Sequence, residues 1–113
     1  MTRLFLDIEV YRNYFLALFM NEEGRVKRYE MFDGDTSKFP ADEIQLILES
    51  PEVEIVTFNG NSYDIPVLTC ALVEKDTKIV KRASDRIIRH NVRPWHFYKD
   101  EGYREPEANH IDI

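Results

Sequence analysis

The sequence contains a single cysteine, Cys70, so no disulfide can form within the chain. Disulfides are typical of oxidising compartments, and their absence here favours a reducing cytosol. Long apolar runs are also missing, since none reaches the roughly 18–20 residues that a membrane-spanning helix requires. The apolar segment Leu4–Leu6 is interrupted at once by Asp7 and Glu9, which argues against a signal peptide. We therefore expect a cytoplasmic protein with Cys70 as a small buried residue rather than a nucleophile.

An excess of basic residues is absent as well. The chain has 15 Lys and Arg against 21 Asp and Glu, a net charge of −6, whereas nucleic-acid binders are usually basic overall. An enzyme that gathers carboxylates around metal ions can nevertheless act on phosphates, because the metals invert the local field. One stretch of the chain is rich in basic residues. Charge alone favours interpreting it as a solvated helix face rather than as a nucleic-acid contact. Its residues are Lys75, Lys78, Lys81, Arg82, Arg86, Arg89 and Arg93.

What the sequence does contain is enough apolar material for one core. It has 113 residues, of which 43% are hydrophobic and seven are Phe, and this composition indicates a folded globular protein. A chain of this length has no room for a second core. We expect one domain over residues 1–113.

Apolar segments separated by turn residues predict an α/β layered domain. The first three segments alternate or end at turns in a way that favours an antiparallel three-strand meander, which alternating helices and strands follow. The expected strands are 3–9, 14–20, 26–32 and 54–58, and the expected helices are 41–50, about 63 or 65 to 73, and 77–90. Residues 91–109 are expected to be irregular, and 111–113 look like the start of a strand. This order resembles the ribonuclease-H-like fold.

Two acids at the end of the first strand form the first candidate site. Residues two apart on a strand project to the same side, so Asp7 and Glu9 face one site while Ile8 packs into the core. Converging carboxylates repel each other unless cations compensate. Mg²⁺ fits such a pair, because it is a hard ion held by one or two carboxylates. The alternative is a strand that simply ends in two solvated acids.

The second candidate site follows the strand 54–58. Asn59 ends this strand, Gly60 allows a tight turn, and Asp64 comes near the start of a helix. Taken alone, these residues indicate only an Asn-Gly turn and a helix cap. An open α/β sheet, however, gathers functional side chains at its strand ends. Here two strand ends supply three acids and an amide.

Taken together, the two motifs resemble the first two motifs of the DEDD-type 3′–5′ exonucleases. The pattern F-x-D-x-E is followed by N-x-x-x-Y-D and then by I-P-V-L. The segments L-D-I-E-V-Y-R-N-Y-F-L-A-L-F and T-F-N-G-N-S-Y-D-I-P-V-L are similar to proofreading domains of phage and family-B-like DNA polymerases. The resemblance covers most of the chain and implies a ribonuclease-H-like fold acting on DNA 3′ ends in phage replication, in the host cytoplasm.

The resemblance also implies roles for individual residues. Asp7 would bridge two metal ions, Glu9 would bind the ion that activates water, and Asp64 would hold the other. Asn59 and Tyr63 would support the second motif or contact the terminal nucleotide. The reaction implied is phosphodiester hydrolysis with two Mg²⁺ or Mn²⁺ ions.

One departure concerns the fourth acid of the family, a late Asp on a C-terminal helix. The chain reaches Ile113 without such a helix, so we expect a partial domain whose C-terminal part is missing. Asp112 in His110-Ile111-Asp112 is the only late candidate, although the matching family position lies on a strand before the last motif. His110 is interpreted as a structural or loop residue.

The late aromatic residues have two readings. They could stack on the bases of a single strand or cover a small core, and we favour the core. These residues are Trp95, His96, Phe97, Tyr98 and Tyr103.

Three functions remain open at this stage. The first is a 3′–5′ exonuclease that acts with a polymerase or is completed by another chain. The second is an inactive exonuclease-like binding or regulatory module, and the third is a small interaction domain with coincidental acids. An exposed sheet edge would also allow a homo-oligomer.

Overall fold

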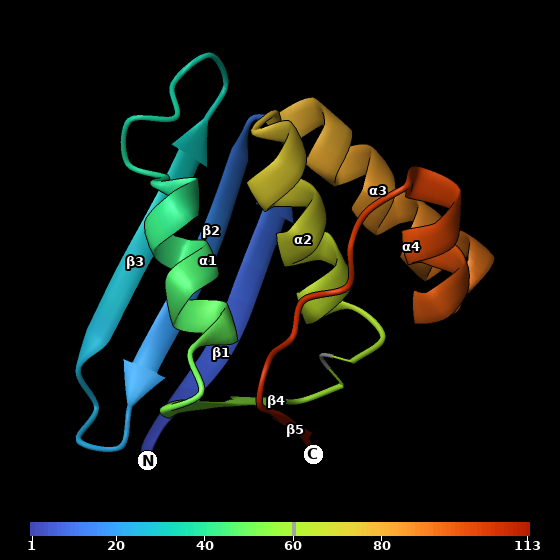
Figure 1. The fold of residues 1–113 in the computed structure, drawn as a ribbon. Coiled ribbons are helices and arrows are strands. Elements are labelled where there is room, and N and C mark those ends of the chain that lie inside the picture. The colour runs from blue at the N-terminus through green and yellow to red at the C-terminus, as the bar shows by residue number, and fades with distance from the viewer. Residues whose placement is uncertain (60) are drawn as a thin grey trace.

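The first part of the chain forms the antiparallel meander that the sequence predicts (Figure 1). The computed structural model describes residues 1–59 and 61–113. Strands β1 (Thr2–Tyr11), β2 (Tyr14–Asn21) and β3 (Val26–Phe32) pair side by side. Within the described residues, the domain is a mixed α/β structure of five strands and four helices. The strand order β3-β2-β1-β4-β5 is compatible with the ribonuclease-H-like arrangement.

Two later strands extend the sheet in parallel with β1. Strand β4 (Val53–Thr57) pairs with β1, and strand β5 (His110–Asp112) pairs with β4. Because the three strands run in one direction, their carboxyl ends lie at the same edge of the sheet. Phe5 pairs with Val56 and Thr57 with Asp112, so Asp7 and Asp112 end up near the same level.

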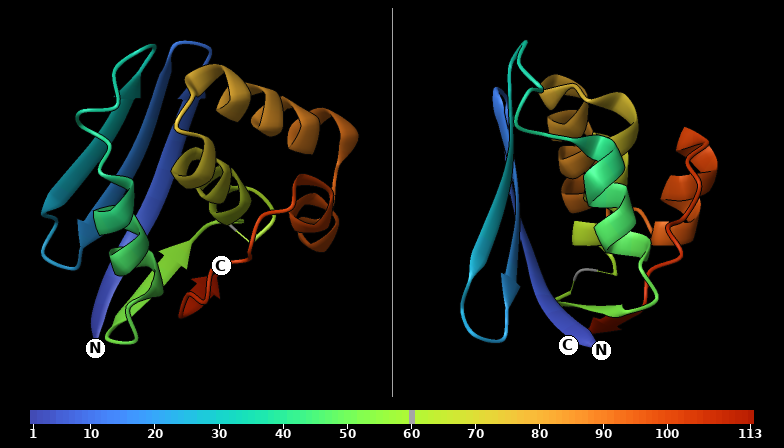
Figure 2. Two further views of the ribbon diagram at one scale, coloured as in Figure 1. Left: turned by 45° about the horizontal axis from the view of Figure 1, so that its top comes forward. Right: turned by 60° about the vertical axis from the view of Figure 1, so that its left-hand side comes forward.

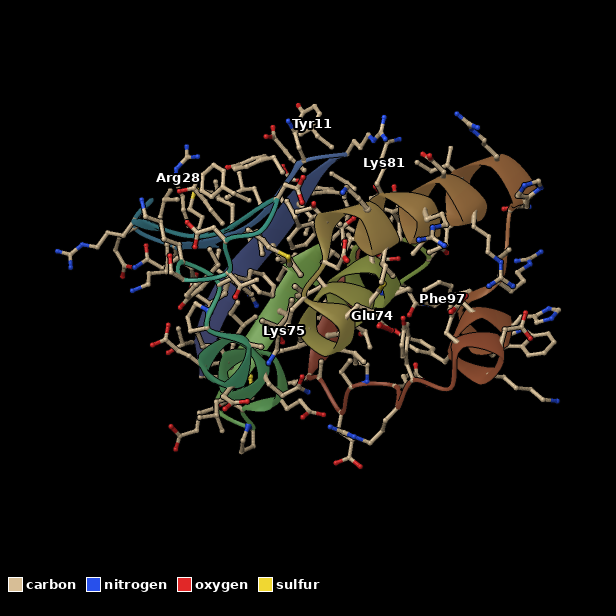
Figure 3. The ribbon with its side chains drawn as sticks, turned by 90° about the horizontal axis from the view of Figure 1, so that it is seen from above. Tyr11, Arg28, Glu74, Lys75, Lys81 and Phe97 are labelled. Atoms are coloured by element: carbon tan, nitrogen blue, oxygen red, sulfur yellow. The ribbon has the colours of Figure 1, made fainter. Side chains whose placement is uncertain are left out.

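The helices lie on one face of the sheet, as the right-hand view of Figure 2 shows. Leu6 and Ile8 of β1 point into this helical layer and are buried, whereas Asp7 and Glu9 are exposed. Figure 3 shows Tyr11 and Arg28 extending from the opposite face, which no described helix covers. Both acids of the first motif therefore project from the uncovered face. The helices are α1 (Ala41–Glu49), α2 (Asp64–Glu74), α3 (Thr77–His90) and α4 (Pro94–Glu101).

Helix α2 is the centre of the core. Nine consecutive residues, Asp64 to Leu72, are buried. Cys70 is fully buried among them, as expected. Among the described residues no helix is both long and apolar enough to cross a membrane.

The expectation of irregular structure over 91–109 was wrong for its first part, which forms α4. Pro94 stands at the start of this helix and Gly102, with φ of 71°, follows its end. Both are ordinary helix-boundary signals. The core provides the stabilisation, because Phe97 is fully buried and contacts the Tyr103 ring, and Tyr98 is 7% exposed. Figure 3 shows Phe97 on the side of α4 that faces the rest of the domain.

Glu49 at the end of α1 fixes the segment that leads to β5. Its carboxylate accepts hydrogen bonds from both terminal nitrogens of Arg104, at 2.9 and 3.0 Å, and from the backbone N–H of Glu107 at 2.7 Å. Gln45 donates a fourth. The Arg104 hydrogen bonds, with those from Gln45 and Glu107, lower the pKa of Glu49 to about 2.

Replacing this carboxylate should destabilise the domain in a pH-dependent way. We expect Glu49→Gln to lower the free energy of unfolding by roughly 1 kcal/mol at pH 7. The folded-state pKa lies below the ordinary value of 4.5, so the stabilisation is complete above that pH and is lost as pH falls toward 2. Urea unfolding at pH 7 and pH 3 measures the difference. Glu52→Gln, in the exposed turn after α1, is the control; an equal loss in both variants would contradict the role of Glu49.

Candidate active site

The two acids of β1 share a face but have different surroundings. The Asp7 Oδ1 atom accepts a hydrogen bond from the Ile8 backbone N–H at 3.0 Å. Glu9 lies opposite Leu16 of β2. Burial and the 2.7 Å hydrogen bond to Glu30 raise the pKa of Tyr14 to about 12, and the charge of Glu9 adds to the rise. Glu9 is therefore directed toward the Tyr14–Glu30 pair.

Asp64 is the buried acid of the site. It is the first residue of α2 and is only 8% exposed. Burial, followed by the negative charges of Asp7 and Asp112, raises its pKa to about 7. Among the described residues, no ion pair includes Asp7 or Asp64. The charges of Asp7 and Asp112 thus lie close enough to add to the effect of burial on Asp64.

Thr57 at the end of β4 holds both polar residues of β5. Its buried hydroxyl donates to Asp112 Oδ1 at 3.0 Å and lies 2.6 Å from His110 Nε2. A hydroxyl has one proton, so the His110 Nε2–H must be the donor in the second contact. Burial lowers the pKa of His110 and so favours the neutral imidazole, although the charge of Asp112 opposes this shift. The hydrogen bond from Thr57 orients Asp112, whose charge adds to the rise in the pKa of Asp64.

Two pockets meet at Asp64 and Phe58. The first has a volume of about 270 Å³ and also contains Asp7. Its other walls are Phe5, Leu6, Leu18 and Met20. The second, of about 310 Å³, lies toward α3 and contains Asn59 and Tyr63. Its other walls are Ser62, Ile87, Ile88 and Asn91. We call these the acidic pocket and the α3 pocket.

The structure brings together four of the five residues that the sequence singled out. Asp7 and Asp64 share the acidic pocket, while Asn59 and Tyr63 line the α3 pocket with Asp64. Glu9 lines neither, and its charge is not among those that raise the pKa of Asp64. Its role as a metal ligand stays a prediction.

Asn59 and Tyr63 shape the loop between β4 and α2. Asn59 has a φ of 60°, a left-handed conformation that Asn tolerates better than most residues. The Tyr63 hydroxyl lies 2.6 Å from Ser84 Oγ on α3, and this contact ties the start of α2 to its neighbour. Gly60, expected to make the turn, lies outside the described residues. The position of Asp64 therefore depends on the left-handed conformation of Asn59 and on the contact between Tyr63 and Ser84.

The donor set is suited to a hard divalent ion. Asp7 and Asp64 offer carboxylate oxygens to one pocket, and Mg²⁺ is usually held by one or two carboxylates with waters and substrate phosphate. A cation there would also relieve the repulsion that raises the pKa of Asp64. Within the described residues, no group of three or more His, Cys, Asp or Glu is arranged around a common metal position. The residues present fit an ion that the substrate helps to hold.

Sequence reasoning underestimated Asp112. Its proximity to Asp64 follows from the pairing of β5 with β4, which places it beside Thr57. The sequence signal for this contact was a short apolar segment that ends at Thr57 and a later one that ends at Asp112. Register between segments so distant in the chain is not readable from either segment alone.

Comparisons with known proteins give a limited likeness. No family model and no curated protein matches the chain. Two solved structures, E. coli exonuclease I with a dT13 oligonucleotide and the ExoI/SSB-Ct complex, are similar at 14% identity and a TM-score of 0.39. Each alignment covers 99% of this chain, which spans 28% of the exonuclease chain. Likeness at this level does not place the chain in a family.

Removing the buried charge should stabilise the metal-free domain. The folded-state pKa of Asp64, about 7, lies above its ordinary 3.8, so ionised Asp64 destabilises the fold increasingly from about pH 4 and fully above pH 7. We expect Asp64→Asn to raise the free energy of unfolding by roughly 1–3 kcal/mol at pH 8 in EDTA and by much less at pH 4. Urea unfolding at both pH values measures this.

A matched control is Glu105→Asn, at an exposed position before β5. It should not reproduce the pH-dependent gain. Destabilisation of Asp64→Asn at pH 8 would show that the carboxylate is favourably paired and would contradict the repulsion described above.

Proposed function

We propose that this domain hydrolyses phosphodiester bonds at the 3′ end of a DNA strand, using divalent metal ions on a ribonuclease-H-like sheet. The observation that carries the proposal is the meeting of Asp7 and Asp64 in one pocket, with the pKa of Asp64 raised to about 7. Perturbed carboxylates that converge from separate elements are typical of functional sites. Asp64, the first residue of α2, is buried at this pocket, whereas Asp7 reaches it from an exposed position on β1.

Asp7, Glu9 and Asp64 would hold the Mg²⁺ or Mn²⁺ ions, which when bound supply an activated water and stabilise the leaving 3′ oxygen. Asp7 and Asp64 both line the acidic pocket, which supports this assignment. Asp7 lies on the exposed side of the sheet and Asp64 within the core, so the ions would sit at the boundary between substrate and protein. The β1 acids would then face the scissile phosphate.

Asp112 supports the site in this proposal. It lies near Asp64, and Thr57 orients it through a 3.0 Å hydrogen bond. It supplies a further negative charge beside Asp64, although the fourth acid that the resemblance implies would lie on a C-terminal helix rather than on β5. Its contribution to metal binding can be compared directly with that of Glu9.

The α3 pocket would receive the terminal nucleotide. Asn59 and Tyr63 lie beside Asp64 there, and the walls include two exposed apolar side chains, Phe58 at 69% and Ile88 at 65%. An aromatic ring and an aliphatic side chain at the surface can pack against a base, while the amide of Asn59 offers hydrogen bonds. A polymerase partner, a proofreading role and a phage source stay predictions from the resemblance.

The proposal is tested with single-stranded DNA labelled at its 5′ end. We expect a metal-dependent ladder that shortens from the 3′ end. Asp7→Asn and Asp64→Asn should each reduce the rate on the order of 100-fold or more, since each removes a group that holds the ions. Glu9→Gln and Asp112→Asn, assayed in parallel, show which of the two acids completes the site.

Thermal unfolding with and without Mg²⁺ or Mn²⁺ accompanies the assay. Stabilisation by metal without cleavage would favour the inactive binding module. Unchanged cleavage in Asp64→Asn, or no response to metal at all, would reject a metal nuclease. Asp42→Asn, an exposed acid at the start of α1, is the control for nonspecific charge effects.

A further inference from the structure

The aromatic residues of α4 divide into two sets. Phe97 and Tyr98 are buried in the core, but Trp95 is 67% exposed and His96 is exposed beside it. The Trp95 and His96 rings stack, with centroids 5.2 Å apart and planes inclined by 15°. The sequence favoured a core-covering role for all of these residues, and for Trp95 and His96 that interpretation was wrong. His96 Nε2 lies 3.4 Å from Asp100 Oδ2, and the exposed Trp95 ring presents an aromatic surface to solvent.

The basic side chains of α3 and of the turn into α4 differ in whether they have carboxylate partners. Arg86 binds Asp100 and Glu101, and Lys81 binds Asp85. Arg89 and Arg93, by contrast, are exposed and belong to none of the ion pairs found in the described part of the chain. Arg89 does lower the pKa of Asp85, after the larger effect of Lys81. Lys78, Lys81 and Arg86 of α3 are thus paired, whereas Arg82, Arg89 and Arg93 belong to none of the ion pairs found among the described residues.

This surface continues from the α3 pocket. Ile87, Ile88 and Asn91 of that pocket come from the end of α3, and Figure 2 shows the chain turning there into α4. Trp95 follows Asn91 by four residues, a separation of at most about 14 Å for an extended chain. A strand whose end occupies the α3 pocket can reach Trp95 within a few nucleotides.

We propose that Trp95 and His96 form a stacking platform for an upstream base of a single-stranded nucleic acid, and that Arg89 and Arg93 bind its phosphates. The inference rests on the proposed function, because it places the 3′ end of the same strand in the α3 pocket. It also specifies the substrate class. A base offers its face to Trp95 only when it is unpaired and unstacked, so the platform selects single strands over duplexes.

The single tryptophan of the chain makes the platform directly observable. Binding is measured in EDTA with oligothymidylate about ten nucleotides long, within the usual site size of single-strand binders. We expect saturable quenching of Trp95 fluorescence in the wild-type protein. Anisotropy of a labelled oligonucleotide then gives dissociation constants for the variants.

Trp95→Ala should weaken binding by roughly 5- to 100-fold, the usual effect of losing one base–aromatic stack. Trp95→Phe should keep most of the affinity, because it keeps a ring. Leu46→Ala, a 74% exposed apolar residue on α1, is the control and should bind like the wild type. Circular dichroism confirms folding, which Trp95→Ala should preserve since the side chain is exposed.

Arg89→Ala and Arg93→Ala test the charges separately. Each should reduce the slope of log K against log salt concentration by about 0.7, the value for one phosphate contact to a single strand. Duplex DNA of the same length should compete poorly. An unchanged salt dependence in both variants would overturn the assignment of these arginines.

Failure of the platform can be told apart from failure of the nuclease proposal, since binding is measured without divalent metal. If the wild type cleaves DNA but Trp95→Ala binds as tightly, the platform is rejected and the nuclease stands. If the oligonucleotide does not bind or leaves Trp95 fluorescence unchanged, the platform is rejected whatever the cleavage assay gives. A change only in sedimentation on Trp95→Ala would identify a protein contact and would also overturn it.

Discussion

Electrostatic repulsion among Asp7, Asp64 and Asp112 is the constraint on which the rest of the site depends. The parallel pairing of β1, β4 and β5 brings three strand ends to one edge of the sheet, and the helix after β4 then begins with a buried acid. Burial and the two neighbouring charges disfavour ionised Asp64. This arrangement lowers the free energy of unfolding when Asp64 is ionised. A divalent cation bound between the acids would restore that stability. Burial is the largest cause of the raised pKa of Asp64, and the proposed metal ion would offset the part that the charges of Asp7 and Asp112 add.

The sequence was a good guide to the parts of the fold that depend on local patterns. Alternating apolar residues predicted the three-strand meander, and helical spacing predicted α1 and α3. The convergence of Asp7 with Asp64 was also predictable, because Asp64 follows a strand that pairs in parallel with the strand that carries Asp7. That first strand continues to Tyr11 instead of ending at the two acids. Helix α4 was missed since its stability comes from burial of Phe97 and Tyr98 rather than from a periodic pattern. The closeness of Asp112 was missed for a different reason, since it requires the register of β5, and that register is set by packing across the whole chain.

Charge shows the same division between local and tertiary causes. The net charge of −6 and a row of lysines and arginines say little about function by themselves. The fold decides which of these charges remain available, because α4 carries Asp100 and Glu101 to Arg86 and leaves Arg89 and Arg93 exposed. The fold likewise leaves Trp95 exposed and buries Phe97, two residues further along the chain. Composition predicted neither which charges stay exposed nor which aromatic side chains do. Both follow from how helix α4 packs.

Helix α2 carries Asp64 on a segment whose first nine residues are buried, so this carboxylate cannot shift without repacking the core. Asp7, on the open face of the sheet, has more rotational freedom. In the proposed metal site, Asp64 would be a fixed oxygen ligand and Asp7 an adjustable one, and such a site would tolerate little expansion around the fixed side. It should thus discriminate by ionic radius, accepting Mg²⁺ or Mn²⁺ more readily than Ca²⁺, whose longer bonds and higher coordination number require more yielding surroundings.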